Sequence, residues 1–157
     1  SGPNCYLLDY VLERMDFADT CEAVEAMTVR NPRALSKLVE DAANGPAVVS
    51  ALRKRIPGFE LVPTGGGKEA RANAIVPLCK GGNVYLPHPE MCPWVSPFLE
   101  HLAAFPSGSI DDDVDAATHA LTKLAEHAMP AGWQPGRAAV RDQAERPIPR
   151  PKTGAWR

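Results

Sequence analysis

Four carboxylates lie within five residues of the chain, at Asp111, Asp112, Asp113 and Asp115. On a helix, Asp112 and Asp115 are three positions apart and Asp111 and Asp115 are four apart, so each pair can share a face. Neighbouring carboxylates repel each other. Proteins keep such clusters at a helix N-terminus, where they complement the helix dipole, or around a cation. The stretch alone leaves both interpretations open.

A second pair of carboxylates, Glu40 and Asp41, follows the predicted strand 34–39 and precedes a turn into a helix. α/β proteins place their chemistry at the carboxyl ends of strands, so this pair is a candidate for a site. Asn44 is a good helix cap, and Pro46 suits the first helical turn. A solvated pair of loop side chains is the alternative interpretation.

A glycine-rich turn, residues 63–71, enters the next predicted helix. It is not a Walker loop, because position 62 is Val62 rather than glycine and position 69 is Glu69 rather than serine or threonine. Backbone amides at the helix start, with Lys68 and Arg71, could still hold a phosphate of a polymer. The alternative is an ordinary flexible turn with two solvated cations.

Hydrophobic periodicity predicts an alternation of strands and helices. The predicted strands are 5–12, 34–39, 59–62 and 83–87. The predicted helices are 17–30, 45–56, 68–78, 94–105 and 110–127. The pattern is that of an α/β domain.

In the last of these helices, Val114, Ala117, Leu121 and Leu124 are expected to form the buried side. His119 lies four positions after Asp115 on the same face. We interpret it as a neighbour of a site or a surface residue rather than a ligand.

The composition is that of a globular protein: 157 residues, 45% hydrophobic and 23% charged. This length fits one domain. No apolar run is long enough to span a membrane. The net charge of −2 divides into −6 for residues 1–130 and +4 for residues 131–157. The net acidic body argues against a general nucleic-acid coat, and we interpret 131–157 as a basic, disordered tail.

The order of motifs resembles a known family. Along the chain they are Tyr-Leu-Leu-Asp, Val-Glu-Asp-x-Ala-Asn-Gly-Pro, Gly-Gly-Lys-x-x-Arg-Ala, Gly-Asn-Val-Tyr-Leu-Pro, Trp-Val-x-x-Phe-Leu and Phe-Pro-x-Gly-x-x-Asp-Asp-x-Val-Asp-Ala. Together they resemble the C-terminal nuclease domain of the terminase large subunit of tailed bacteriophages, over about residues 5–125. That family has a ribonuclease H-like fold, a mixed α/β sheet flanked by helices, related to the RuvC-type resolvases.

The resemblance implies a metal-dependent endonuclease that cuts double-stranded viral DNA during genome packaging, with two Mg²⁺ or Mn²⁺ ions as cofactors. Glu40 matches the second acidic ligand of the family, with Asp41 as a possible substitute. Asp112 matches the last ligand, with Asp115 one turn on and Asp111 as the alternative. The family usually has a histidine where Ile110 stands.

The resemblance further assigns Lys68, Arg71 and Arg53 to the DNA backbone, which they would contact without reading its sequence. It implies several partners besides DNA: the terminase ATPase domain, the small terminase subunit and the portal. It also implies a location in the cytoplasm of the bacterial host, with no membrane partner.

In this fold the first catalytic aspartate lies on a central strand that precedes the Tyr-Leu-Leu-Asp strand. This chain begins at the later strand, so residues 1–130 are expected to form an N-terminally incomplete nuclease domain whose sheet lacks its central hairpin. Asp9 lies on the wrong strand to replace the missing carboxylate. The alternative function is a catalytically inactive remnant, or a module that binds DNA or a packaging partner.

Overall fold

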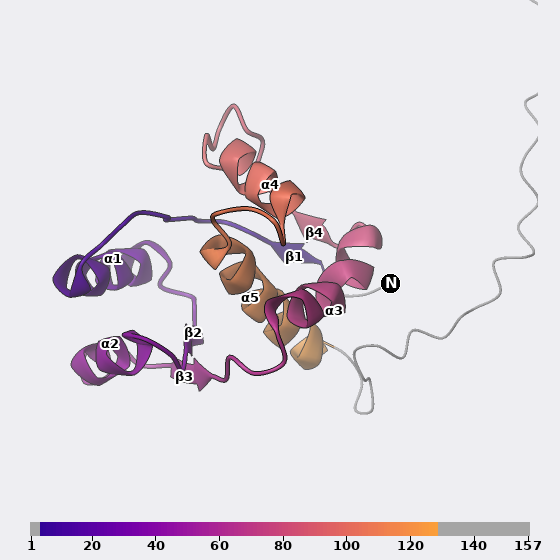
Figure 1. Ribbon diagram of the computed structural model, residues 1–157. Coiled ribbons are helices and arrows are strands. Elements are labelled where there is room, and N and C mark those ends of the chain that lie inside the picture. Colours follow the sequence, from indigo (N-terminus) through magenta and orange to yellow (C-terminus); the bar gives the residue numbers. More distant parts are fainter. Residues whose placement is uncertain (1–3, 129–157) are drawn as a thin grey trace, which may run out of the picture.

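The computed structural model describes residues 4–128, which form five helices and four short strands (Figure 1). In chain order they are β1 (Cys5–Tyr6), α1 (Phe17–Arg30), β2 (Lys37–Glu40), α2 (Gly45–Leu52), β3 (Phe59–Val62), α3 (Lys68–Lys80), β4 (Val84–Tyr85), α4 (Val95–Ala104) and α5 (Asp112–Ala128). The alternation of strands and helices confirms the predicted α/β class. The predicted tail, residues 131–157, and its boundary near residue 130 lie outside the described residues.

β2 and β3 form a parallel pair joined by α2, with Glu40 opposite Val62. The amides of Lys37 and Asp41 both donate hydrogen bonds to backbone carbonyls on the β3 side, with N–O distances of 2.7 and 2.8 Å. Because successive residues of a strand alternate in direction, the backbone groups of Leu38 and Glu40 point to the opposite edge. Within residues 4–128, no other strand pairs with that edge. β2 therefore has one open edge beside Glu40.

β1 and β4 form a second parallel pair, in which Tyr6 lies opposite Tyr85. Their rings stack with centroids 4.9 Å apart. The amide of Leu7 donates the last bond of this ladder to the carbonyl of Tyr85, at 3.0 Å. The predicted strand 5–12 is therefore too long, because the chain after Leu7 has no strand neighbour among the described residues.

The buried hydrophobic side chains form two separate clusters. One is formed by side chains of β1, α3 and α5 and contains Cys5, Ile75, Leu78 and Leu121. The other lies between α1, α2 and β3 and contains Val48, Leu52 and Ile56. The helices divide in the same way, because α3 and α4 pack on α5, whereas α1 packs on α2 (Figure 1). The space between the two clusters is where the candidate site lies.

The buried face of α5 differs in part from the prediction. Val114 and Leu121 are buried as expected, but Leu124 is 49% exposed. Ala125 and Thr118 are buried instead, because α3 packs along α5. Leu124 faces the cavity described below. Within residues 4–128, none of the helices has the length and apolar character needed to cross a membrane.

Asp9 links the segment after β1 to the end of α1 through side-chain hydrogen bonds. Its Oδ2 accepts from Arg30 Nε at 3.0 Å and from Asn31 Nδ2 at 2.8 Å. Burial acts to raise the pKa of Asp9. The hydrogen bonds from Arg30, Asn31 and the Tyr10 amide, with the charge of Arg30, outweigh it and lower the pKa overall.

We therefore expect Asp9→Asn to destabilise the fold at neutral pH by about 1 kcal/mol, an amount typical of a partly exposed ion pair. A carboxylate with a lowered pKa contributes stability above its unfolded-state value of about 3.9, and that stability is lost as the pH falls through its folded-state pKa. Urea unfolding across this pH range measures the difference between the two proteins. A difference that is the same at pH 7 and below the folded-state pKa, or one that Glu13→Gln reproduces, would contradict the role of the charge.

Candidate active site

The turn after β2 fixes the position of Glu40. A side chain at Gly45 would place its Cβ 2.1 Å from the carbonyl oxygen of Glu40, so the turn requires glycine there. Ala43 has a φ of 47°, which tightens the same turn. Asn44 precedes α2 as predicted, but its side chain makes no capping hydrogen bond. The turn thus holds Glu40 at the carboxyl end of β2, where the open edge begins.

The four carboxylates of the acidic stretch point to different surroundings. Asp112 is exposed at the first residue of α5. Asp113 and Asp115 are buried, each with 6% of the residue exposed. Asp111 precedes the helix, and its carbonyl accepts from the Asp115 amide at 2.9 Å. The first turn of α5 therefore divides its charges between a cavity and the interior.

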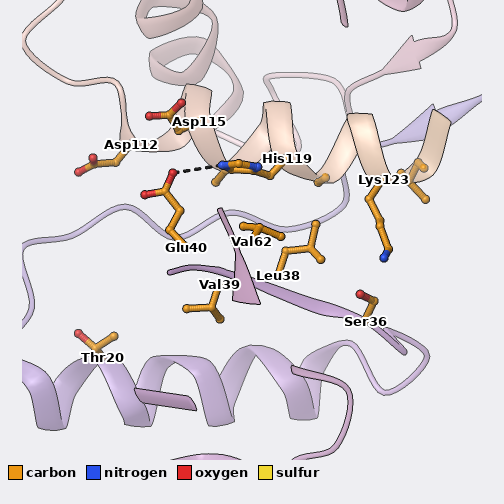
Figure 2. A pocket seen from close by; sticks show the side chains of 13 residues that line it. Thr20, Ser36, Leu38, Val39, Glu40, Val62, Asp112, Asp115, His119 and Lys123 are labelled. Atoms are coloured by element: carbon orange, nitrogen blue, oxygen red, sulfur yellow. Dashed lines mark hydrogen bonds and ion pairs between the residues drawn. The ribbon is translucent and has the colours of Figure 1, made fainter. Parts of the chain in front are cut away.

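A cavity of about 770 Å³ lies between α5 and the β2–β3 pair. Its lining residues are Thr20, Ser36, Leu38, Val39, Glu40, Val62, Asp112, Asp115, Ala116, His119, Ala120, Lys123 and Leu124. Figure 2 shows the carboxylates of Glu40, Asp112 and Asp115 at one end of it and Lys123 at the other. The structure thus brings together, from two distant parts of the chain, three of the residues that the sequence singled out.

Lys68 and Arg71 neutralise the most buried of these carboxylates. Lys68 Nζ lies 2.9 Å from Asp115 Oδ2 and 2.8 Å from Asp111 Oδ1, and Arg71 Nη2 lies 2.8 Å from Asp115 Oδ1. Burial acts to raise the pKa of Asp115, but the hydrogen bonds and charges of the two cations outweigh it and lower that pKa. The hydrogen bonds to Asp111 and Asp115 in turn raise the pKa of Lys68. Two of the three cations expected at a DNA backbone are therefore at the site.

His119 and Lys123 belong to the site, although neither of them was assigned a role in chemistry from the sequence. His119 Nε2 lies 3.1 Å from Glu40 Oε1 (Figure 2), and only 12% of its side chain is exposed. Lys123 Nζ lies 2.6 Å from Glu60 Oε2. Asp115, His119 and Lys123 are spaced by four residues, so the helical period places them on one face. That spacing was the signal that could have identified them.

Asp113 has a structural environment that the sequence did not indicate. Its Oδ2 lies 2.6 Å from His101 Nδ1 and accepts from the Tyr10 hydroxyl at 2.7 Å. Tyr10 stacks on Trp94 with ring centroids 5.3 Å apart. This network joins α4, the segment after β1 and the first turn of α5. Asp113 does not line the cavity, so this network fixes the helix through contacts outside it.

Two predicted residues are not brought to the carboxylate cluster. Asp41 is exposed and does not line the cavity, although it follows Glu40 directly. Arg53 follows the last residue of α2. Gly45, the first residue of that helix, packs on Glu40, so Arg53 is separated from the site by the length of α2, roughly 12 Å.

The donor atoms at the acidic end of the cavity fit a hard divalent cation in their chemistry. Glu40 and Asp112 present carboxylate oxygens to the same space, and carboxylates are what Mg²⁺ and Mn²⁺ bind in proteins. In residues 4–128, no three His, Cys, Asp or Glu side chains converge closely enough to hold an ion together. The described residues thus supply suitable ligands, but not a complete set in one place.

The comparison with known families identifies the chain. A model of the family described as "Terminase RNaseH-like domain" matches residues 2–124. The chain belongs to this family. The match confirms the resemblance to the terminase nuclease domain, and with it the ribonuclease H-like α/β class. No curated protein and no solved structure matches the chain. Terminase membership connects the chain in general terms with a nuclease fold and with DNA packaging.

The hydrogen bond between Tyr10 and Asp113 provides a test of how this terminase domain fixes α5. We expect Tyr10→Phe to lower the free energy of unfolding by about 1–3 kcal/mol, the usual contribution of a hydrogen bond to a charged group. Chemical denaturation followed by circular dichroism measures it. Tyr85→Phe, at a residue that is 42% exposed, is the matched control, with an expected change within about 0.5 kcal/mol. Equal effects of the two substitutions would show that the Asp113 network does not hold α5.

Proposed function

We propose that this chain carries part of the active site of a metal-dependent endonuclease that cleaves double-stranded viral DNA during genome packaging. The observation that supports it most directly is the shared cavity of Glu40, Asp112 and Asp115. These residues come from the end of β2 and the start of α5. Carboxylates that repel each other are gathered in this way where a cation is to be bound. Membership of the terminase family supports the same reaction class.

In this proposal Glu40 and Asp112 hold Mg²⁺ or Mn²⁺, with Asp115 as a further ligand and Asp111 and Asp41 as the alternatives. A pair of such ions, when bound, supplies an activated water and stabilises the leaving oxygen of a phosphodiester. The chain's own contribution is positioning. His119 Nε2, 3.1 Å from Glu40 Oε1, orients that carboxylate toward the cavity.

Lys68 and Arg71 bind the phosphate backbone in this proposal, and Arg53 extends the contact along α2. Lys68 has 45% of its side chain exposed beside the acidic end of the cavity. Phosphate contacts of this kind position DNA without selecting a sequence, and they weaken steeply with salt.

The open edge of β2 supports the proposal that a further strand completes this sheet. The strand would pair with the outward-facing backbone groups of Leu38 and Glu40. A second cavity, of about 410 Å³, also borders β2 and is lined in part by Tyr6, Leu8 and Leu38. A strand placed along the open edge would bury the exposed side chains of Tyr6 and Leu8 and bring another carboxylate to Glu40.

The partners follow from the proposed reaction. They are double-stranded DNA, the terminase ATPase domain, the small terminase subunit and the portal, and the place of action is the cytoplasm of the bacterial host. The alternative is a catalytically inactive remnant or a binding module. That alternative is favoured by the internal neutralisation of Asp115 by Lys68 and Arg71, at 2.9 and 2.8 Å.

A plasmid-nicking assay with Mn²⁺ separates the two functions. We expect Glu40→Gln and Asp112→Asn each to reduce metal-dependent nicking by about 100-fold or more, since even residues that only support a metal ligand contribute about 10–100-fold. Glu22→Gln, an exposed residue of α1, is the control and should nick normally. Asp41→Asn tests the alternative ligand.

Two results would contradict the endonuclease. One is nicking by the double variant Glu40→Gln/Asp112→Asn at the rate of the unchanged chain. The other is an absence of Mn²⁺ binding by the unchanged chain while it still binds duplex DNA, which would favour the binding module.

A further inference from the structure

The cations of the site are engaged with its carboxylates rather than directed at solvent. Lys68 Nζ bridges Asp111 and Asp115, at 2.8 and 2.9 Å, and Arg71 Nη2 contacts Asp115 at 2.8 Å. Arg71 Nη2 also lies 3.8 Å from Glu40 Oε1. Only 8% of the Asp115 side chain is exposed. Two positive charges are therefore paired with Asp115, the most buried carboxylate of the cavity. Asp115 is also a proposed ligand of a divalent cation.

These two side chains have room and bonding capacity for another partner. Lys68 begins α3 directly after Gly65, Gly66 and Gly67, and a Cβ at any of the three glycines would meet nothing within 4 Å. Its side chain is 45% exposed. Arg71 donates one bond to the Thr64 carbonyl, at 2.9 Å, while its buried Nε has no partner in the described part of the chain.

Carboxylates and phosphates offer these cations equivalent partners. An ammonium or guanidinium group makes short, charge-assisted bonds to either oxyanion. A divalent cation on Asp115 would neutralise the carboxylate that Lys68 and Arg71 share. A nearby DNA phosphate would then compete with Asp111 alone for the flexible lysine.

We infer that Lys68 and Arg71 are exchangeable counterions, which neutralise Asp115 in the free chain and pass to a DNA phosphate when a divalent cation binds the carboxylates. This inference rests on the proposed function, because it assumes a divalent cation and DNA at this cavity. In this inference, Lys68 and Arg71 pair first with Asp115 and then with a DNA phosphate. Metal binding and DNA binding are then positively coupled, and thermodynamic linkage makes the coupling equal in both directions.

The first test compares Lys68→Met with Lys80→Met, which removes the same charge from the opposite end of α3. Mn²⁺ affinity is measured by calorimetry without DNA, and duplex affinity by fluorescence anisotropy with and without Mn²⁺. In the unchanged chain, Mn²⁺ should tighten duplex binding by about fivefold or more, within the usual range of coupling between sites. Lys68→Met should bind Mn²⁺ about threefold to fivefold more tightly, because its competing internal cation is gone.

Lys68→Met should also bind the duplex less tightly. Mn²⁺ should change that affinity by roughly the square root of the fold-change in the unchanged chain, about twofold for a fivefold coupling, because Arg71 alone still exchanges. Lys80→Met should keep the Mn²⁺ affinity and the coupling of the unchanged chain. If Lys68→Met binds Mn²⁺ more weakly, Lys68 is a fixed structural ion pair and the inference is wrong. Unchanged coupling in that variant overturns it as well.

A second variant tests the exchange without any metal. Asp115→Asn removes the carboxylate that both cations share, which frees Arg71 from its closest ion pair and leaves Lys68 with Asp111 alone. Its metal-free duplex affinity should therefore rise by several-fold, about that of one released phosphate contact. Asp41→Asn removes one negative charge nearby without touching Lys68 or Arg71 and should produce a smaller rise. Equal rises in the two variants would overturn the exchange.

The outcomes also separate this inference from the proposed function. If the unchanged chain binds Mn²⁺ and nicks DNA but its metal and duplex affinities are independent, only the exchange is wrong. If the chain binds no Mn²⁺ at all, both the exchange and the proposed metal-dependent cleavage are wrong.

Discussion

The candidate site depends on the neutralisation of one buried carboxylate. Asp115 lies on α5, and its partners Lys68 and Arg71 both lie on α3, so the ion pairs fix how these helices face each other. A charge at this depth is tolerated only when it is paired, because removing it from water is otherwise unfavourable by several kcal/mol, as a rough figure. Arg71 extends the network to Glu40 at the end of β2. The acidic end of the cavity is built around this group of charges.

Helix α5 joins two parts of the molecule that have separate hydrophobic clusters. Apolar packing holds each part together, whereas the contacts between them include the polar pairs His119–Glu40 and Lys123–Glu60. Polar contacts across a cavity adapt to a ligand more readily than close packing does. We propose that a strand on the open edge of β2 would stabilise this junction, so that folding of the sheet and completion of the site become one event.

Much of the fold could be predicted from local patterns. α1 has its predicted bounds, 17–30, and the Asp16 side chain caps its start by accepting from the Asp19 amide at 2.9 Å. β3 also has its predicted bounds, 59–62. The length of β1 could not be predicted, because a strand ends where its partner ends and β4 has only two residues.

The candidate site was predictable in its carboxylates and not in their surroundings. Glu40 and the acidic stretch 111–115 stood out because the end of a strand and the start of a helix are local features, whereas the choice of Asp112 within that stretch came from the family resemblance. The pairing of Asp113 with Tyr10 and His101 joins segments far apart in the chain, and no local pattern indicated it. The spacing of His119 left it as either a neighbour of a site or a surface residue, because its contact with Glu40 depends on how α5 faces β2.

The most direct test of the metal-binding proposal is to locate the bound ion. Paramagnetic Mn²⁺ added to isotope-labelled chain broadens the nuclear magnetic resonance signals of nearby backbone amides. The proposed site predicts that the amides of Glu40, Asp112 and Asp115 broaden first and that those of the loop from His88 to Cys92 are spared. Broadening centred on that loop, or none at stoichiometric Mn²⁺, would contradict a metal-dependent site between β2 and α5.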